Sequence, residues 1–356
     1  MKKVWIGLIA VALIAILGWF FFEQQNQKNN QQEIIKVGVV LPLTGNLSFI
    51  GDFVKNSLLL VRTDSVEFIF EDCGGNPKDA VTSTKKLIEQ NQVASIISVL
   101  SFLSESVNSI CENKNVKHFI FAFSPSLVEK SNIIRPFVSS TEEAKMIVSF
   151  INEKKMKKVA FLRHIEPDAE YAFKNTIQPM LNQSNVEIVD LPFNNQTTKD
   201  FKNDILKLKN SNVELVIIQS LAYNISNIMS AYTEYSLSTP ILGDINFLDI
   251  HDDVTKEKVN NIPFIGLSYV LSDEYSMYAN KYLETYNIEP FALGACAFDL
   301  VLILKHLVPK EKQSFISNAN SLDIKGVTGK IQYNTNGDQI IHYTILKYEN
   351  NHIVNF

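Results

Sequence analysis

Short apolar runs alternate with amphipathic stretches along residues 34–266 of the chain. The first run, residues 34–41, is continuous and rich in β-branched side chains, and it stops at Pro42, which predicts a buried strand of a parallel sheet. Residues 77–90 begin with a proline and carry two lysines towards the end, a pattern that is typical of a helix. Because such pairs repeat over this length, the sequence predicts an α/β fold with parallel sheets and right-handed crossovers.

The alternation falls into two blocks, and each block predicts one doubly wound lobe. In the first block the predicted strands and helices are strands 34–41, 66–71, 93–99 and 117–122 with helices 51–61, 77–90 and 103–113. In the second block they are strands 158–162, 186–189, 213–218, 240–242 and 262–266 with helices 142–153, 169–181, 199–208 and 225–235. Helices 274–286 and 291–307 and a strand-rich tail, 326–356, with a turn at 334–337, complete the chain.

The N-terminal segment has a different character. Residues 4–22 contain no charged or polar side chain, and as a helix at about 1.5 Å per residue they would span a bilayer core of about 30 Å. No small-residue cleavage site follows them, so residues 1–22 predict an uncleaved signal-anchor, the alternative being secretion after cleavage at an unrecognised site. Lys2 and Lys3 precede the span, which places the rest of the chain on the extracytoplasmic side. Residues 23–33 contain eight Asn or Gln in eleven positions and predict a flexible linker.

Composition and motifs narrow the function classes. A formal net charge of −5 argues against a nucleic-acid binder, and 46% hydrophobic residues argue against a disordered chain. The chain lacks phosphate-loop, dinucleotide-binding, zinc-protease and serine-hydrolase motifs, so we expect neither an enzyme nor a cofactor. His164 with Glu166, and His251 with its two following aspartates, are too few to predict a metal site.

Six segments, taken in order, resemble the periplasmic solute-binding proteins of ABC transporters, of the branched-chain amino acid type. They are KVGVVLPLTG with FIGDFVKNSLLL, FEDCGGNPKDAVTSTKKLI, SIISVLS, AFSPSLVEK, IEPFALGACAFDLVLIL and GVTGKIQYNTNGD. The resemblance implies two lobes that are joined by three crossovers and close on a small solute. We expect residues 34–138 and 268–325 to form the first lobe, and residues 139–267 and 326–356 the second.

The same resemblance implies binding positions in the loops that follow the strands. In the first lobe these fall on Ser101 and Phe102, where the family usually holds the ligand carboxylate, and on Phe123 and Ser124. Ser101 and Ser104 have the alternative role of helix caps, and the two phenylalanines that of core residues. A family disulfide is not possible here, because Ser101 stands opposite Cys73; we expect a free Cys73 thiol, and Cys111 and Cys296 as packing residues.

In the second lobe the matching positions fall near three strand ends. They are Asp168 and Tyr171, then Ser220, Leu221 and Tyr223, and finally Asp244. Asp244 is the expected partner of a ligand ammonium group, with a solvated turn residue as the alternative reading.

These features favour a binding protein that captures an amino acid or a small, partly apolar carboxylate and delivers it to an ABC transporter permease. The alternative is a membrane-anchored sensor that signals through a partner protein. Only residues 1–3 would lie in the cytoplasm, which leaves no output domain on this chain and weakens the sensor hypothesis.

Overall fold

The first lobe is built on a parallel sheet of five strands. The computed structural model describes residues 34–61, 63–304 and 312–356. The sheet has the order β2-β1-β3-β4-β5, with β1 in its interior. Its strands are β1 (Ile35–Leu41), β2 (Val66–Asp72), β3 (Ser95–Val99), β4 (Lys117–Phe121) and β5 (Ile133–Ile134). All of its strand pairs are parallel, as the continuous apolar runs predicted.

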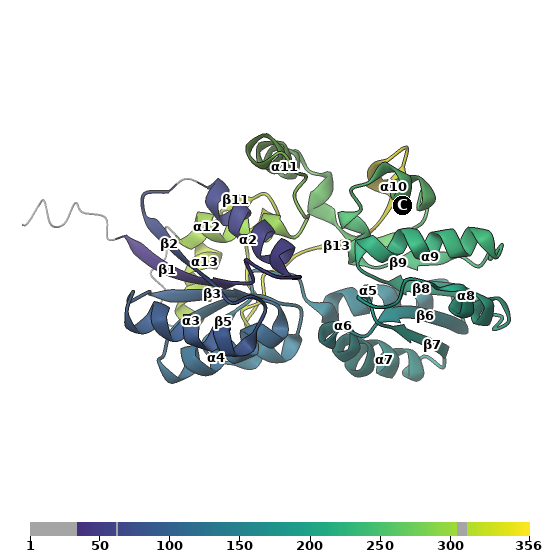
Figure 1. Cartoon of the computed structure of the whole chain (residues 1–356), viewed down its shortest axis with the longest axis horizontal. Helices are drawn as coiled ribbons and strands as arrows, with labels where there is room; N and C mark the ends of the chain where they lie inside the picture. Colours follow the sequence, from purple (N-terminus) through teal and green to yellow (C-terminus); the bar gives the residue numbers. More distant parts are fainter. Residues whose placement is uncertain (1–33, 62, 305–311) are drawn as a thin grey trace, which may run out of the picture.

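Helices cover both faces of this sheet. Figure 1 shows α3 (Pro77–Glu89) and α4 (Ser101–Asn113) on one face, and α2 (Ser48–Leu60), α12 (Gly294–Leu304) and α13 (Lys312–Ser321) on the other. Helix α3 begins as predicted, because the Asn76 side chain accepts a hydrogen bond from the Lys78 N–H at 2.8 Å and Pro77 occupies the first turn.

The second lobe contains a mixed sheet of seven strands, in the order β14-β13-β10-β9-β8-β6-β7. Its strands are β6 (Lys158–His164), β7 (Glu187–Phe193), β8 (Leu215–Gln219), β9 (Ile241–Gly243), β10 (Phe264–Leu267), β13 (Tyr343–Glu349) and β14 (His352–Asn355). Strand β13 pairs antiparallel with β10 and with β14. We predicted a parallel sheet for this lobe, and that prediction is wrong for the C-terminal strands.

Helices also cover the second sheet. They are α5 (Ser140–Glu153), α6 (Pro167–Ala172), a π-helical segment (Phe173–Ile177), α7 (Gln178–Gln183), α8 (Lys202–Lys209), α9 (Ala222–Glu234) and the short α10 (Asp253–Lys258). The helix that we predicted over residues 169–181 is present, but its middle is π-helical instead of α-helical. Pro179 provides the reason: in a regular helix its ring would clash with the carbonyl four residues earlier, and the wider π segment lies directly before it.

The chain crosses between the lobes three times. The first crossing runs from β5 to α5 and the second from β10 to α11 (Asp273–Tyr286), which packs against α2 of the first lobe. The third crossing lies later than the predicted boundary at 325–326. The short hairpin of β11 (Lys325–Gly326) and β12 (Gly329–Lys330) and the following Tyr333 still pack on the first lobe, because the Tyr333 ring contacts Phe315, which contacts Phe119 of β4.

The crossings are hydrogen-bonded to one another. The Arg135 N–H donates to the Gly337 carbonyl at 2.8 Å, and the Arg135 carbonyl accepts from the Gln339 N–H at 2.9 Å. The Ser268 N–H donates to the His342 carbonyl at 3.0 Å. The third crossing is therefore held against both of the others.

Three further predictions concern the cysteines and the N-terminus. Cys73, Cys111 and Cys296 are buried free thiols, as expected. The predicted anchor and linker, residues 1–33, lie outside the described residues. Within the described part of the chain, no helix is long and apolar enough to cross a membrane.

Candidate ligand-binding cleft

The loops that follow the strands of both sheets meet at the boundary between the lobes, and two neighbouring cavities lie there. The inner cavity has a volume of about 90 Å³ and the outer one about 400 Å³. Both have Leu221 and Asn246 in their walls. Ligands of doubly wound sheets bind beyond the carboxyl ends of the strands, so this is the candidate ligand site.

The inner cavity has one aromatic contribution from the first lobe and a polar wall from the second. Phe123 follows β4, and its ring packs edge-on against Phe137 at 5.2 Å between centroids. The polar side chains of the opposite wall end β6 and β8, follow β9 or lie on α5. They are Ser140, Glu143, His164, Gln219, Asp244 and Asn246.

Two buried carboxylates dominate this wall. Glu143 Oε1 accepts a hydrogen bond from the Ile245 N–H at 2.9 Å, and Asp244 accepts from the Asn246 N–H at 3.1 Å and from its Nδ2 at 2.7 Å. Burial raises the pKa of Glu143. Burial, and in second place the neighbouring Glu143, raise the pKa of Asp244 well above its usual range. Ionisation of both carboxylates at once is therefore unfavourable unless a positive charge lies beside them.

The remaining polar groups of the inner wall differ in how well they are satisfied. His164 Nδ1 is hydrogen-bonded to a carboxylate oxygen of Glu166, which also accepts from Asn195 at 3.4 Å. Burial is the largest single effect and opposes ionisation of Glu166, but the hydrogen bond and charge of His164, together with the bonds from Asn195 and the backbone, outweigh it and lower the pKa of this carboxyl. Gln219 is 5% exposed, and its side-chain oxygen accepts no hydrogen bond from the described residues.

The outer cavity is more aromatic and is walled by both lobes. Phe49 and Phe291 lie 6.1 Å apart between ring centroids on the first-lobe side, and Leu221 and Tyr223 lie on the second-lobe side. His251 packs edge-on against Phe291 at 5.4 Å. An amphipathic ligand could thus place a polar group in the inner cavity and an apolar body in the outer one.

The hydroxyl groups that we expected to bind a ligand carboxylate are used inside the first lobe. Ser101 is the first residue of α4, and its Oγ accepts a hydrogen bond from the Ser124 N–H at 3.2 Å. Ser124 Oγ lies 3.0 Å from Ser126 Oγ. Neither Ser101 nor Ser124 lines the inner or the outer cavity.

Behind these serines lies Arg135, which is 1% exposed. Its guanidinium donates to the carbonyls of Phe123 and Ser124 at 2.9 Å each, and to Asp338 at 2.8 Å. Arg135 therefore fixes the loop after β4 and ties it to the third crossing.

The other predicted positions have varied surroundings. Phe102 packs against the apolar cluster of α3 and α4 and lines neither cavity, so of the two phenylalanines only Phe123 faces the inner cavity. Tyr171 lies exposed on α6, and the side chain of Asp168 lies outside the described part of the chain. Their roles as ligand contacts stay predictions.

At the loop after β8, the predicted residues divide between cavity wall and scaffold. Leu221 lines both cavities, and Tyr223 lines the outer one while its hydroxyl donates to the Asn195 carbonyl at 3.2 Å. Ser220 is buried, and its hydroxyl donates to the Leu221 carbonyl at 3.1 Å. Asp244 is 2% exposed and lines the inner cavity, so it is not a solvated turn residue.

Sequence reasoning missed Glu143, Gln219 and the aromatic pair of the outer cavity. Glu143 stands in the first turn of α5, where an acidic residue ordinarily compensates the helix dipole, so its type carried no distinct signal. Gln219 ends a fully buried strand, and a lone amide at that position was the available clue. His164 was noted only as a weak metal candidate; no cluster of three or more metal-binding side chains occurs among the residues described by the structure.

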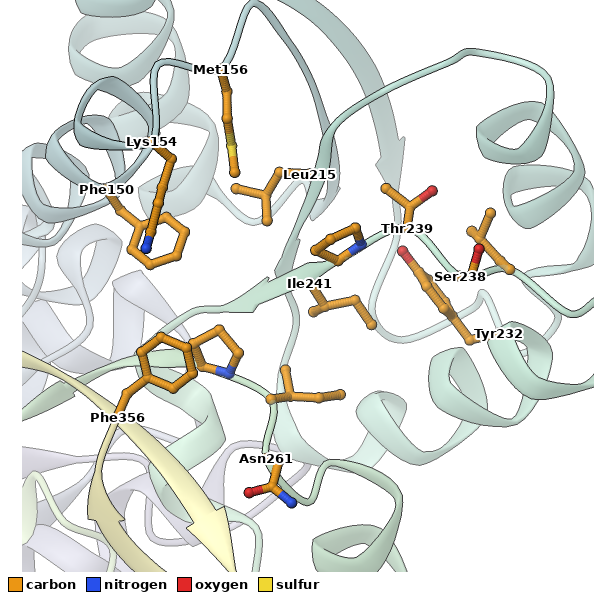
Figure 2. A pocket seen from close by; sticks show the side chains of 14 residues that line it. Phe150, Lys154, Met156, Leu215, Tyr232, Ser238, Thr239, Ile241, Asn261 and Phe356 are labelled. Atoms are coloured by element: carbon orange, nitrogen blue, oxygen red, sulfur yellow. The ribbon is translucent and has the colours of Figure 1, made fainter.

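A larger cavity, of about 460 Å³, lies elsewhere on the second lobe (Figure 2). Its wall includes Leu215 and Ile241, the first residues of β8 and β9, together with Phe150 of α5 and Tyr232 of α9. It therefore opens at the amino ends of the strands, opposite to the edge where doubly wound sheets bind ligands, and its wall comes from one lobe alone.

Comparison with known proteins gives a family match. The sequence pattern of a family described as periplasmic binding protein matches residues 34–347, most of the chain. No curated protein sequence matches significantly.

Solved structures of the same architecture include a leucine-binding protein of Thermotoga maritima, with a TM-score of 0.74 at 18% identity, over 90% of this chain and 97% of that one. A branched-chain amino acid transporter substrate-binding protein of Streptococcus pneumoniae, in complex with isoleucine, has a TM-score of 0.73 at 19% identity, over 90% and 98%. A solute-binding protein of Rhodopseudomonas palustris, in complex with benzoate, has 0.73 at 14%, over 90% and 95%. At these identities the likeness shows the shared fold.

Proposed function

We propose, from the premise that the chain belongs to the periplasmic binding protein family, that it is the solute-binding component of an ABC transporter. It captures a small amino acid or a small, partly apolar carboxylate between its two lobes and delivers it to the transporter's permease. A family of binding proteins is in line with the prediction that the chain is not an enzyme.

The observation that carries the proposal is the pair of adjoining cavities, which have walls from both lobes at the carboxyl ends of the strands. Such a site is buried when the lobes close, which allows a small molecule to be recognised on all sides. The related structures contain isoleucine in one case and benzoate in another, and both are small molecules with an apolar body.

A thermal-shift screen tests this function. A ligand that binds only the folded protein stabilises it in proportion to the logarithm of its saturation. A library of amino acids, amines, amides, sugars and short carboxylates should contain a small apolar amino acid or acid that raises the Tm. A well-folded protein that responds to no member, or only to a neutral sugar, would contradict the proposal.

We also propose that residues 1–22 keep the protein on the membrane, with the binding lobes on the extracytoplasmic side. The support is the uninterrupted apolar run of residues 4–22 and the two lysines before it. Mass spectrometry of the mature protein should find the N-terminal residues retained, in the membrane fraction. Soluble protein that begins near Glu23 would contradict the anchor and leave the binding function untouched.

A further inference from the structure

We propose that, among the small, partly apolar solutes of the proposed function, the cleft selects those with a positively charged nitrogen, amino acids or the corresponding amines, and does not require a carboxylate. This inference rests on the proposed function, because it names the ligand class of the same site.

The first support is the charge of the inner wall. Glu143 and Asp244 both line the inner cavity, and Ile245, which donates to Glu143, directly follows Asp244 in the chain. Two buried carboxylates at one site repel each other and are costly to keep ionised without a cation. An ammonium group between them would allow both to ionise, whereas a ligand carboxylate there would add a third negative charge.

The second support is an acceptor without a donor. Gln219 lines the same cavity and is 95% buried (5% exposed), and its side-chain oxygen has no partner among the described residues. A buried carbonyl oxygen without a hydrogen bond is unfavourable, because it has lost its bond to water and gained none in the protein. A protonated amine carries up to three N–H donors and can satisfy this oxygen together with the two carboxylates.

The third support is the scarcity of positive charge around the cleft. In the parts of the chain that the structure describes, neither cavity is lined by a lysine or an arginine. The histidines that do line them are already bonded to acids, His164 to Glu166 and His251 to Glu289 at 2.8 Å. Asp249 and Asp252 add further acidic groups to the outer wall. A free carboxylate would find no lysine or arginine in the described walls, only histidines that already pair with acids.

The outer cavity accounts for the apolar body. It adjoins the inner cavity through Leu221 and Asn246 and offers the rings of Phe49, Tyr223 and Phe291. Its volume of about 400 Å³ has room for an aromatic or branched aliphatic group that extends from the amine. The faces of these aromatic rings also attract a nearby cation, so the outer cavity is compatible with the charged nitrogen in the inner one.

Matched ligands test the inference on the full chain in mild detergent by titration calorimetry. Two triplets differ only in their charged groups: leucine, isoamylamine and 4-methylpentanoate, and phenylalanine, phenethylamine and 3-phenylpropionate. In at least one triplet the amine should bind within about tenfold of the amino acid or more tightly, and the carboxylate at least about 100-fold more weakly.

The variant Glu143→Gln sharpens the test. Glutamine keeps an oxygen for the Ile245 N–H but removes the charge, so the affinity for the amine should fall at least about tenfold while the fold persists. The matched control is Glu142→Gln, because Glu142 lies exposed beside it on α5, where it pairs with Lys145 at 2.7 Å. This control should bind as the unaltered protein does. Equal affinity of both variants for the amine would overturn the inference.

Failure of the inference and failure of the proposed function give different results. If the carboxylate of either triplet binds and its amine does not, the amine preference is wrong and the solute-binding function stands. The same holds if none of the six binds and the wider library yields a ligand without a positively charged nitrogen. A library that yields no ligand at all removes both.

Discussion

The two lobes meet the cleft with walls of different chemistry. On the first lobe, Ser101 and Ser124 are hydrogen-bonded within the lobe, so the part of this lobe that faces the inner cavity is the ring of Phe123. On the second lobe, Glu143, Gln219 and Asp244 face the same cavity with oxygen acceptors. The difference indicates a division of roles, in which the first lobe gives the site its shape and the second recognises the charge of the ligand.

The largest effect should come from removing the arginine that holds the first-lobe wall. Arg135→Met would leave Asp338 and the carbonyls of Phe123 and Ser124 without their buried donor, which should lower the free energy of unfolding by about 3–5 kcal/mol in denaturant titration.

A corresponding change in the second lobe provides the comparison. Arg163→Met also removes a buried arginine, which is paired with Glu170 and Asp190, but these carboxylates are 29% and 35% exposed and can be hydrated. The loss should therefore be smaller than for Arg135. If Arg163→Met proved the more destabilising variant, the first-lobe wall would not depend on Arg135 as described.

The next effect in size concerns recognition. Asp244→Asn keeps an oxygen for the Asn246 N–H but removes the charge, so ligands with an amine should lose about 1.5–3 kcal/mol of binding free energy. A carboxylate without an amine should bind no more weakly than before, because the variant removes a negative charge that would repel it. Titration calorimetry with phenethylamine and benzoate measures both, and an equal loss for the two would show that this wall does not distinguish charge.

Asp299 is a buried acid outside the cleft, so it shows the effect of burial on stability without an effect on ligand recognition. Asp299, on α12 of the first lobe, is 0% exposed and accepts hydrogen bonds from the Val327 and Thr328 N–H groups at 2.8 and 2.9 Å. Burial raises its pKa to about 6, although these bonds oppose the change. Because the folded protein holds this proton more tightly than the unfolded chain, the stability contributed by Asp299 is present below about pH 4 and is lost as the pH rises through about 6.

The corresponding prediction compares pH profiles. Between pH 4 and pH 7 the unaltered protein should lose about 1–3 kcal/mol more unfolding free energy than Asp299→Asn, in denaturant titrations at each pH. Ligand affinity should be the same for both proteins at pH 7. Parallel stability profiles would contradict the raised pKa.

The smallest effect should follow from Ser101→Ala. Its hydroxyl accepts one hydrogen bond from Ser124, so the variant should be less stable by about 0.5–1.5 kcal/mol, with little change in affinity. A tenfold or greater loss of carboxylate binding would instead show that the first lobe recognises charge.

Much of the fold could be predicted because the strands are nearly pure apolar runs with clear stops, such as Pro42 after β1. Helix α13 was missed because its sequence, KQSFISNANS, is mostly polar; Phe315, Ile316 and Ala319 lie on one face, but three apolar residues are too few to stand out as a helical pattern. The continuation of the first lobe beyond residue 326 depends on Tyr333 packing on Phe315, a tertiary contact that local pattern cannot indicate.

A site residue was predictable where its position after a strand is enough to bring it to the cleft. It was less predictable where a neighbouring residue of the fold decides which way its side chain turns. Asp244 directly follows β9 and Leu221 lies two residues after β8, and both line the inner cavity. Ser101 and Phe102 also follow a strand, yet the hydroxyl of Ser101 meets Ser124 and the ring of Phe102 turns into the cluster of α3 and α4. These choices depend on which neighbours the fold brings close, and sequence position alone does not carry that information.

The hydrogen bonds among the three crossings restrict how the lobes can move mechanically. Arg135 is bonded to the backbone of Gly337 and Gln339, and Ser268 to that of His342, so the connections form one narrow ribbon instead of three independent tethers. A ribbon bends readily across its plane but resists bending and shear within its plane. Opening and closing should therefore approach a motion with a single degree of freedom, which returns Phe123 to the same place opposite Glu143 and Asp244 in every cycle.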